Sequence, residues 1–163
     1  MLRFLRLFKH YYFGISFIGI AAFVLQEIPY IVMPLIKLPS NPIMNMQKGI
    51  KWLDIVQGVF GVLSMILLMM IVRDDVKVFS IAAPKEKFFF FLTAAMLLIN
   101  FAGWVFYYMG NQYGWLIVLT QFAVVPLYYL FYGLWMKNYL LVLTAVPFFV
   151  IHTINGYINF MRA

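Results

Sequence analysis

Long apolar stretches, separated by short polar or charged connections, run along most of this chain. A helix needs about 20 consecutive apolar residues to cross the hydrocarbon core of a bilayer. The pattern therefore predicts an all-α protein, a polytopic membrane helical bundle of about five transmembrane helices. We expect residues 1–163 to form a single integral membrane domain. The predicted spans are residues 12–36, 53–72, 88–109, 115–135 and 139–160.

Prolines and turn-forming residues mark the ends of these stretches. Pro29 and Pro34 lie in the second half of the first stretch and predict a kink or local unwinding, because proline removes a backbone N–H. Residues 37–51 are predicted to be a loop, with a short interfacial helix at 44–52. Only the tripeptide MKN separates the last two stretches, so the last three helices are predicted to run antiparallel.

The basic residues of the connections indicate the orientation of the bundle. Cytoplasmic connections carry an excess of Lys and Arg. With the N-terminus inside, eight of the 12 Lys and Arg residues fall on the inner side. We therefore expect the N-terminus inside and the C-terminus outside, in the plasma membrane if the chain is bacterial.

Composition supports a membrane protein and narrows the partners. Hydrophobic residues make up 66% of the chain and charged residues 10%, whereas soluble domains carry about 25% charged residues. The net charge of +7 comes from basic residues in the first ten positions and in the connections. That distribution suits anionic lipid headgroups better than a nucleic-acid duplex. Membrane lipids are therefore the expected partner, and nucleic acid is not.

Most signatures of catalysis and of cofactor binding are missing from the sequence. The chain has no cysteine, which excludes disulfides, thiolate metal sites and cysteine nucleophiles, and it has two histidines. GxGxxG, P-loop, HExxH and GxSxG motifs are not present. We therefore predict no cofactor, no metal site and no catalytic residue.

Strongly polar side chains interrupt all five apolar stretches at a similar depth. A rise of about 1.5 Å per residue places them in the outer half of the bundle. Because such groups cost several kcal/mol in hydrocarbon unless they find partners or water, we expect a shared polar cavity. The nine residues are Gln26, Glu27, Asp54, Gln57, Asn100, Gln121, His152, Asn155 and Asn159. The predicted ligand-binding residues are Glu27, Asp54, Gln57, Asn100, Trp104, Gln121, His152 and Asn155.

Several of these residues also have a purely structural interpretation. Asp54 could cap the second helix, where a carboxylate favours the positive N-terminal end. Asn100 and Gln121 could join neighbouring helices by hydrogen bonds. His152 could be a buried histidine without a role in binding.

Glu27 is the residue most indicative of function. A carboxylate at its depth has to be paired, hydrated or protonated. Because the interior of each predicted span is free of Lys and Arg, three states remain: a protonated Glu27, a pair with His152, or a bound cationic ligand. The acids and the many aromatic residues suit an amphipathic amine, through ion pairing and cation–π contacts.

These observations predict a protein that binds or transports a small lipophilic or cationic molecule through a polar cavity in the outer half of the bundle. One alternative is an intramembrane enzyme on a lipid or sterol-like substrate, with Glu27 or Asp54 and His152 as acid and base. Another is an accessory membrane subunit whose polar layer faces a partner membrane protein. A homo-oligomer is also compatible with the sequence.

One combination of residues is similar to a known family. An acidic residue near a proline in the first span, a second acid opening the next span and an aromatic fourth span resemble the EXPERA group of sterol-isomerase and sigma-2-like proteins. The residues are Glu27, Pro29, Asp54 and the stretch VVPLYYLFYGLW. The resemblance covers a small part of the chain, and this chain has five predicted spans where that group has four.

Overall fold

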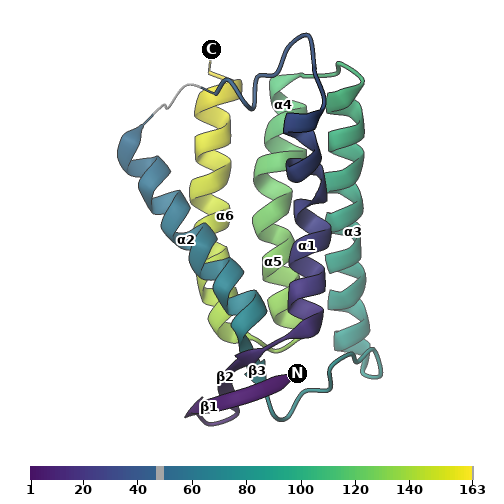
Figure 1. The fold of residues 1–163 in the computed structure, drawn as a ribbon, viewed down its shortest axis with the longest axis vertical. Helices are drawn as coiled ribbons and strands as arrows, with labels where there is room; N and C mark the ends of the chain where they lie inside the picture. Colours follow the sequence, from purple (N-terminus) through teal and green to yellow (C-terminus); the bar gives the residue numbers. More distant parts are fainter. Residues whose placement is uncertain (47–49, 163) are drawn as a thin grey trace.

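The computed structural model describes residues 1–46 and 50–162, and most of them are helical (Figure 1). As the hydropathy pattern predicted, the described residues include five helical segments long and apolar enough to cross a membrane. These segments are Phe17–Leu35, Lys51–Met70, Pro84–Tyr108, Gly114–Trp135 and Tyr139–Phe160.

The helices run alternately up and down, so that the two chain termini lie at opposite ends of the bundle (Figure 1). One end, here called the sheet end, carries the β-strands and the connections 74–83 and 136–138. The other end, here called the C-terminal end, carries the connections 36–46 and 109–113. The helices are α1 (Phe17–Val32), α2 (Lys51–Met70), α3 (Pro84–Tyr108), α4 (Gly114–Ile117), α5 (Val124–Trp135) and α6 (Tyr139–Phe160).

A three-stranded antiparallel sheet corrects the prediction of an all-α fold. Its strands are β1 (Leu2–Phe8), β2 (Tyr11–Ile15) and β3 (Ile71–Arg73), in the order β1-β2-β3. Residues 12–15 were assigned to the first span, but they form β2, and α1 begins only after Ser16, whose hydroxyl accepts a hydrogen bond from the Gly19 N–H (3.1 Å). The pairing of β2 with β3 could not be predicted from hydropathy, because it joins residues about 60 positions apart, such as Tyr11 and Arg73.

The other predicted boundaries lie close to the observed ones. The fifth span and α6 have the same bounds, while α2 ends at Met70 because the next three residues join the sheet. α3 begins at Pro84, four residues before the predicted start, and proline is well tolerated in the first turn of a helix. The predicted interfacial helix at 44–52 includes residues 47–49, which lie outside the described residues, and α2 begins at Lys51.

The first span is less disturbed by its prolines than the sequence suggested. α1 continues through Pro29 to Val32, and the Tyr108 hydroxyl donates a hydrogen bond to the Pro29 carbonyl (2.7 Å). The backbone tightens only around Pro34, into the short 3-10 helix η1 (Met33–Leu35). The predicted kink at Pro29 is therefore not seen as a break in the helix.

A π-helical turn, η2 (Val118–Ala123), interrupts the fourth span between α4 and α5. Pro126 has no N–H, so it cannot donate to the Gln121 carbonyl, five residues earlier. The Tyr30 hydroxyl approaches that carbonyl instead (3.5 Å), and the Asn100 amide donates to the neighbouring Thr120 carbonyl (2.8 Å). The turn thus offers backbone acceptors to side chains of α1 and α3.

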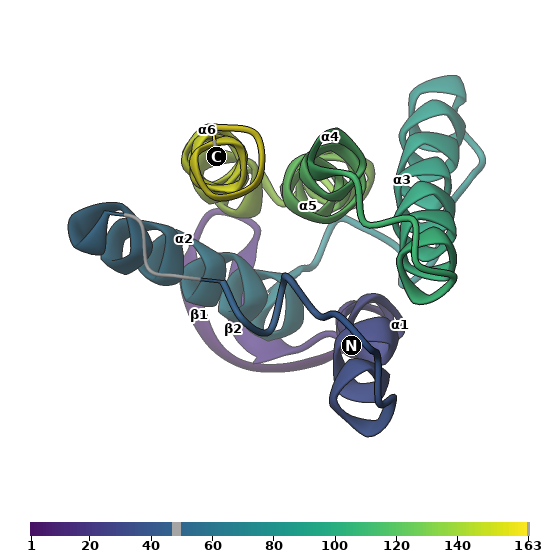
Figure 2. The ribbon, with the colours of Figure 1, turned by 90° about the horizontal axis from the view of Figure 1, so that it is seen from above.

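The fourth span is the centre of the bundle. α5 lies between α3 and α6, with α1 and α2 covering one side (Figure 2). Its tyrosines, Tyr128, Tyr129 and Tyr132, are almost completely buried. Many apolar side chains of the other helices remain exposed, as expected for surfaces that contact lipid.

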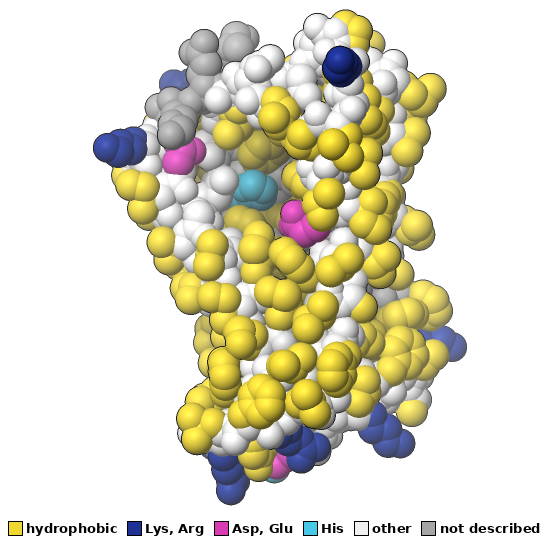
Figure 3. Space-filling view, in the orientation of Figure 1, with side chains coloured by type: hydrophobic (Ala, Val, Ile, Leu, Met, Phe, Trp, Pro, Cys, Tyr) yellow, Lys and Arg dark blue, Asp and Glu magenta, His cyan; other side chains and the backbone are white. Residues whose placement is uncertain are grey.

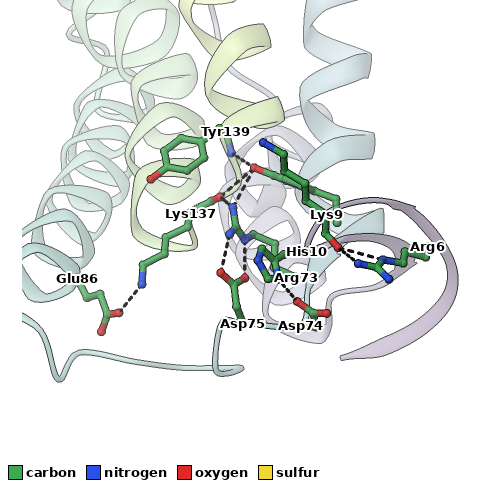
Figure 4. A network of polar contacts seen from close by, with 10 residues as sticks. Arg6, Lys9, His10, Arg73, Asp74, Asp75, Glu86, Lys137 and Tyr139 are labelled. Carbon is green, nitrogen blue, oxygen red and sulfur yellow. Dashed lines mark hydrogen bonds and ion pairs between the residues drawn. The ribbon is translucent and has the colours of Figure 1, made fainter.

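Arg73 connects the sheet to the turn between α5 and α6 (Figure 4). Its guanidinium donates to the Lys137 carbonyl (2.9 Å) and to the Tyr11 hydroxyl (3.1 Å), and it forms a two-pronged ion pair with Asp75 (2.7 and 2.8 Å). These bonds from Arg73 hold the pKa of the Asp75 carboxyl below its usual range. A second ion pair, from Lys137 to Glu86 (3.3 Å), joins the same turn to α3.

Gly19 on α1 and Gly58 on α2 give a matched test of how closely these two helices pack. A Cβ at Gly19 would press into the Leu68 carbonyl of α2, whereas a Cβ at Gly58 would meet nothing within 4 Å. We expect Gly19→Ala to destabilise the protein by about 1–3 kcal/mol through overpacking. Gly58→Ala should be neutral or stabilise it by up to about 1 kcal/mol. Thermal unfolding in detergent measures both, and equal midpoints for the two variants would contradict the close contact of α1 with α2.

Candidate functional site

A cavity of about 310 Å³ lies between α1, α2, α5 and α6, in the half of the bundle nearer the C-terminal end. Figure 3 shows it as a hollow with a histidine side chain inside and an acidic side chain beside it. Its volume is at the lower end of the range for small-molecule sites. The lining residues are Gln26, Glu27, Tyr30, Gln57, Gly58, Gly61, Val62, Met65, Val125, Tyr129, Phe148 and His152.

Glu27 supplies the carboxylate of the cavity. It lies on α1 and is partly buried. The ion pairs of residues 1–46 and 50–162 are those of His10, Arg73 and Lys137, all at the sheet end. The Glu27 carboxylate thus has no cationic partner in the described part of the chain, although it faces a largely apolar space.

His152 lines the same cavity but does not form an ion pair with Glu27. Its ring packs against Phe122 and Phe148, with centroid distances of 4.6 and 4.9 Å. Its Nδ1 atom is buried and has no hydrogen-bond partner among the described residues. A protonated imidazole would need acceptors for both ring N–H groups. Three states were expected for Glu27. One of them, an ion pair with His152, is not formed in the structure.

Gln26 and Tyr129 form the wall between α1 and α5. Gln26 is buried, and its Oε1 atom accepts a hydrogen bond from the Tyr129 hydroxyl (2.8 Å). One turn earlier on α1, the Ala22 carbonyl accepts from Tyr128 (2.9 Å). Both bonds join α1 to α5, so the position of Glu27 is set by its neighbours on the helix.

Three more of the predicted residues form a polar cluster that ties α2 to α6. The Asn155 amide donates to Asp54 Oδ1 (2.9 Å) and to Gln57 Oε1 (2.8 Å). Asn159 in turn donates to the Asn155 carbonyl and side chain (2.8 and 2.9 Å). Of the three predicted residues only Gln57 lines the cavity. Asp54 and Asn155 contact Gln57 or its partner and lie outside the lining. Within residues 1–46 and 50–162, the side chain of Asp54 bonds to Asn155 and makes no capping bond at the start of α2.

Asn100, Trp104 and Gln121 lie on α3 and η2, next to Tyr30, and do not line the cavity. Asn100 donates to Gln121 Oε1 (3.2 Å), which joins α3 to η2. Trp104 is 1% exposed and packs edge-on against Tyr30 (4.8 Å between centroids). The structure thus places these three predicted residues in an interhelical contact, and a ligand-binding role for them stays a prediction.

Several residues that line the cavity were not predicted from the sequence. Tyr30 follows Glu27 by three positions and shares its helix face, a signal that was available. Gly58 and Gly61 have the spacing of helix-packing positions, which favours a structural interpretation. In the structure Gly58 borders open space, and a Cβ at Gly61 would only touch the Phe148 ring at 3.4 Å.

A second group of titratable side chains lies at the sheet end. Candidate ligand atoms of His10, Asp74 and Asp75 are within 4.8 Å of one another. His10 Nδ1 is hydrogen-bonded to Asp74 (2.9 Å), and both Asp75 oxygens are bound by Arg73 (Figure 4). These contacts make the group part of the ion-pair network that fixes the sheet.

Comparisons with protein-family models, curated proteins and solved structures found no match to this chain. The similarity to the EXPERA group therefore rests only on the residues named above.

Asn155 gives a test of the polar cluster. Asn155→Leu keeps the approximate shape but leaves Asp54 and Gln57 without their donor. An unsatisfied buried polar group costs about 1–3 kcal/mol, so we expect a lower midpoint of thermal unfolding in detergent. Asn159→Leu is the control and should cost less, because Asn159 bonds only to Asn155 in the described residues. An Asn155→Leu variant as stable as the parent protein would refute this role.

Proposed function

We propose that the protein is a multi-pass membrane protein that binds, or carries across the membrane, a small lipophilic or cationic molecule in the cavity between α1, α2, α5 and α6. The observation that carries the proposal is the Glu27 carboxylate, which borders this cavity without a cationic partner in the described residues. A carboxylate among apolar groups is costly to keep ionised, and a bound cation offsets that cost.

The rest of the lining supports an amphipathic cation. The aromatic rings of Tyr30, Tyr129 and Phe148 line the cavity beside Glu27. Aromatic faces attract ammonium groups, by about 2 kcal/mol or more where water is excluded. Val62, Met65 and other apolar side chains complete the lining and favour an apolar body on the ligand.

The two alternatives have less support. An acid–base enzyme needs its two groups within hydrogen-bond reach in a plausible substrate complex. Glu27 and His152 are not bonded, and Asp54 is held by Asn155 outside the cavity lining. An accessory subunit would need an outward-facing polar layer, but Asn100, Gln121 and Asn155 are buried inside this chain.

The proposed orientation places the sheet end inside and the C-terminal end outside. Its support is the distribution of Lys and Arg, since the sheet end carries the basic residues of β1, β3 and the connections next to them. With this orientation the cavity lies in the outer half of the membrane.

The orientation can be tested by single-cysteine labelling, because the chain has no cysteine of its own. Asn111→Cys places a thiol in the turn at the C-terminal end, and Val78→Cys places one in a connection at the sheet end. In intact cells we expect a membrane-impermeant maleimide to label the first variant. The second should react only after permeabilisation, and the reverse pattern would invert the proposed orientation.

Glu27→Gln tests the proposed binding role. Dodecylamine is the probe, because an alkylammonium keeps its charge below about pH 10. In the parent protein its binding should weaken as the pH is lowered, because protonation of Glu27 removes the counter-charge. In Glu27→Gln binding should be about tenfold to a hundredfold weaker at pH 8, the effect of a charged hydrogen bond, and independent of pH. Isothermal titration of the purified protein measures both.

Dodecanol is the matched control, since it has the same chain and no charge. It should bind the parent and Glu27→Gln equally, while the thermal unfolding midpoints of the two proteins show that the fold is intact. Dodecylamine binding that does not change with pH in the parent, or that survives in Glu27→Gln, would contradict the role of Glu27.

A further inference from the structure

α1 and α2 come into close backbone contact at the sheet end. There the Ser16 N–H donates to the Met69 carbonyl (2.8 Å), and Gly19 lies directly against the backbone of Leu68. Toward the C-terminal end α2 leans away from α1, so that the two helices form a V (Figures 1 and 2).

Above this apex the two helices are bonded to different neighbours. α1 is held by tyrosine hydroxyls of α3 and α5, among them Tyr108 on the Pro29 carbonyl. α2 is held to α6, by Ser64 with Thr144 (3.0 Å) and by the bonds that Asn155 donates. Within residues 1–46 and 50–162, side-chain hydrogen bonds do not link α1 with α2. The side of the bundle between them, here called the α1–α2 wall, therefore lacks side-chain hydrogen bonds in the part of the chain that the structure describes.

The cavity opens through this wall. Gly58 is exposed, with open space where a side chain would begin, and Val62 beside it is 53% exposed. Figure 3 looks at the helices from the side and shows the hollow directly, surrounded by hydrophobic side chains. Exposed Val24, Ile55 and Val59 lie on the same two helices. In a membrane such a mouth faces acyl chains and not water.

The lining has a polar part, to which Glu27, Gln57 and His152 contribute, and an apolar part, in which Gly58, Gly61 and Val62 of α2 offer no polar side chain. A ligand that matches both parts of the lining has a compact polar head and an apolar chain, and the chain can extend toward the mouth of the cavity.

We propose that the ligand is a single-chain amphiphilic amine, bound by its head in the cavity while its chain passes between α1 and α2 and remains in the bilayer. This inference rests on the proposed function and adds the class of ligand and its route. If the alkyl chain stays in lipid, additional methylene groups do not change the affinity of the membrane-dissolved amine for the protein. This consequence can be measured.

The test uses the full chain in phosphatidylcholine nanodiscs and a series of amines from decylamine to hexadecylamine. Affinity is expressed as the mole fraction of amine in the bilayer. We expect it to vary less than about twofold along the series, although partitioning from water strengthens about fourfold with each methylene. A closed cavity would instead reject the amines above a certain length.

Single substitutions test whether the ligand enters beside Gly58. Gly58→Leu places a side chain in the mouth and should weaken binding of every amine in the series at least tenfold. Ala102→Leu is the control, because Ala102 is exposed on α3 and does not line the cavity, and this variant should stay within about twofold of the parent. The chain-length series on the parent protein tests the route even where the larger substitution impairs folding.

The outcomes separate the two proposals. A sharp length limit in the parent, or unchanged affinity in a folded Gly58→Leu, overturns the route through the α1–α2 wall. If the amines nevertheless lose their binding in Glu27→Gln, the proposed function stands. If Glu27→Gln binds the whole series as the parent does, both proposals are overturned.

Discussion

Polar groups inside an apolar bundle have to find partners within the protein, since lipid offers none. This requirement explains most of the contacts between the helices. Asn155 joins α6 to α2, Asn100 joins α3 to η2, and Tyr129 joins α5 to α1 through Gln26. The carboxylate of Glu27 borders the cavity and has no ion-pair partner in the described part of the chain. In the proposed function, a bound cation supplies that partner.

The same bonds also determine the shape of the cavity. The π-helical turn and the tyrosines of the fourth span hold α1 close to the centre of the bundle, while the amide cluster draws α2 toward α6. Because Gly19 fixes the two helices against each other at the sheet end, their separation grows toward the C-terminal end. The hollow between them is a consequence of where each helix finds its partners.

The sheet end has a different basis for its stability. Arg73 binds a carboxylate, a phenol and a backbone carbonyl at once, and so connects a strand, a loop and the turn before α6. This network lies where solvent and headgroups can reach it, so ion pairs are tolerated there at lower cost than in the interior. It keeps the apex of α1 and α2 attached to the rest of the bundle.

The sequence determined the number, length and approximate bounds of the five apolar helices, because the ability to cross hydrocarbon is a property of each stretch alone. It also determined how far along its helix each polar side chain lies, since the rise per residue is fixed. It could not determine the sheet, where Tyr11 meets Arg73 across 62 positions. It predicted that Glu27 and His152 share a cavity, but it could not tell that Asn100 belongs to another cluster. The position of a residue along its helix depends on the local sequence alone. The direction in which its side chain points depends on the rotation and tilt of the helix, and these are set only when all the helices pack together.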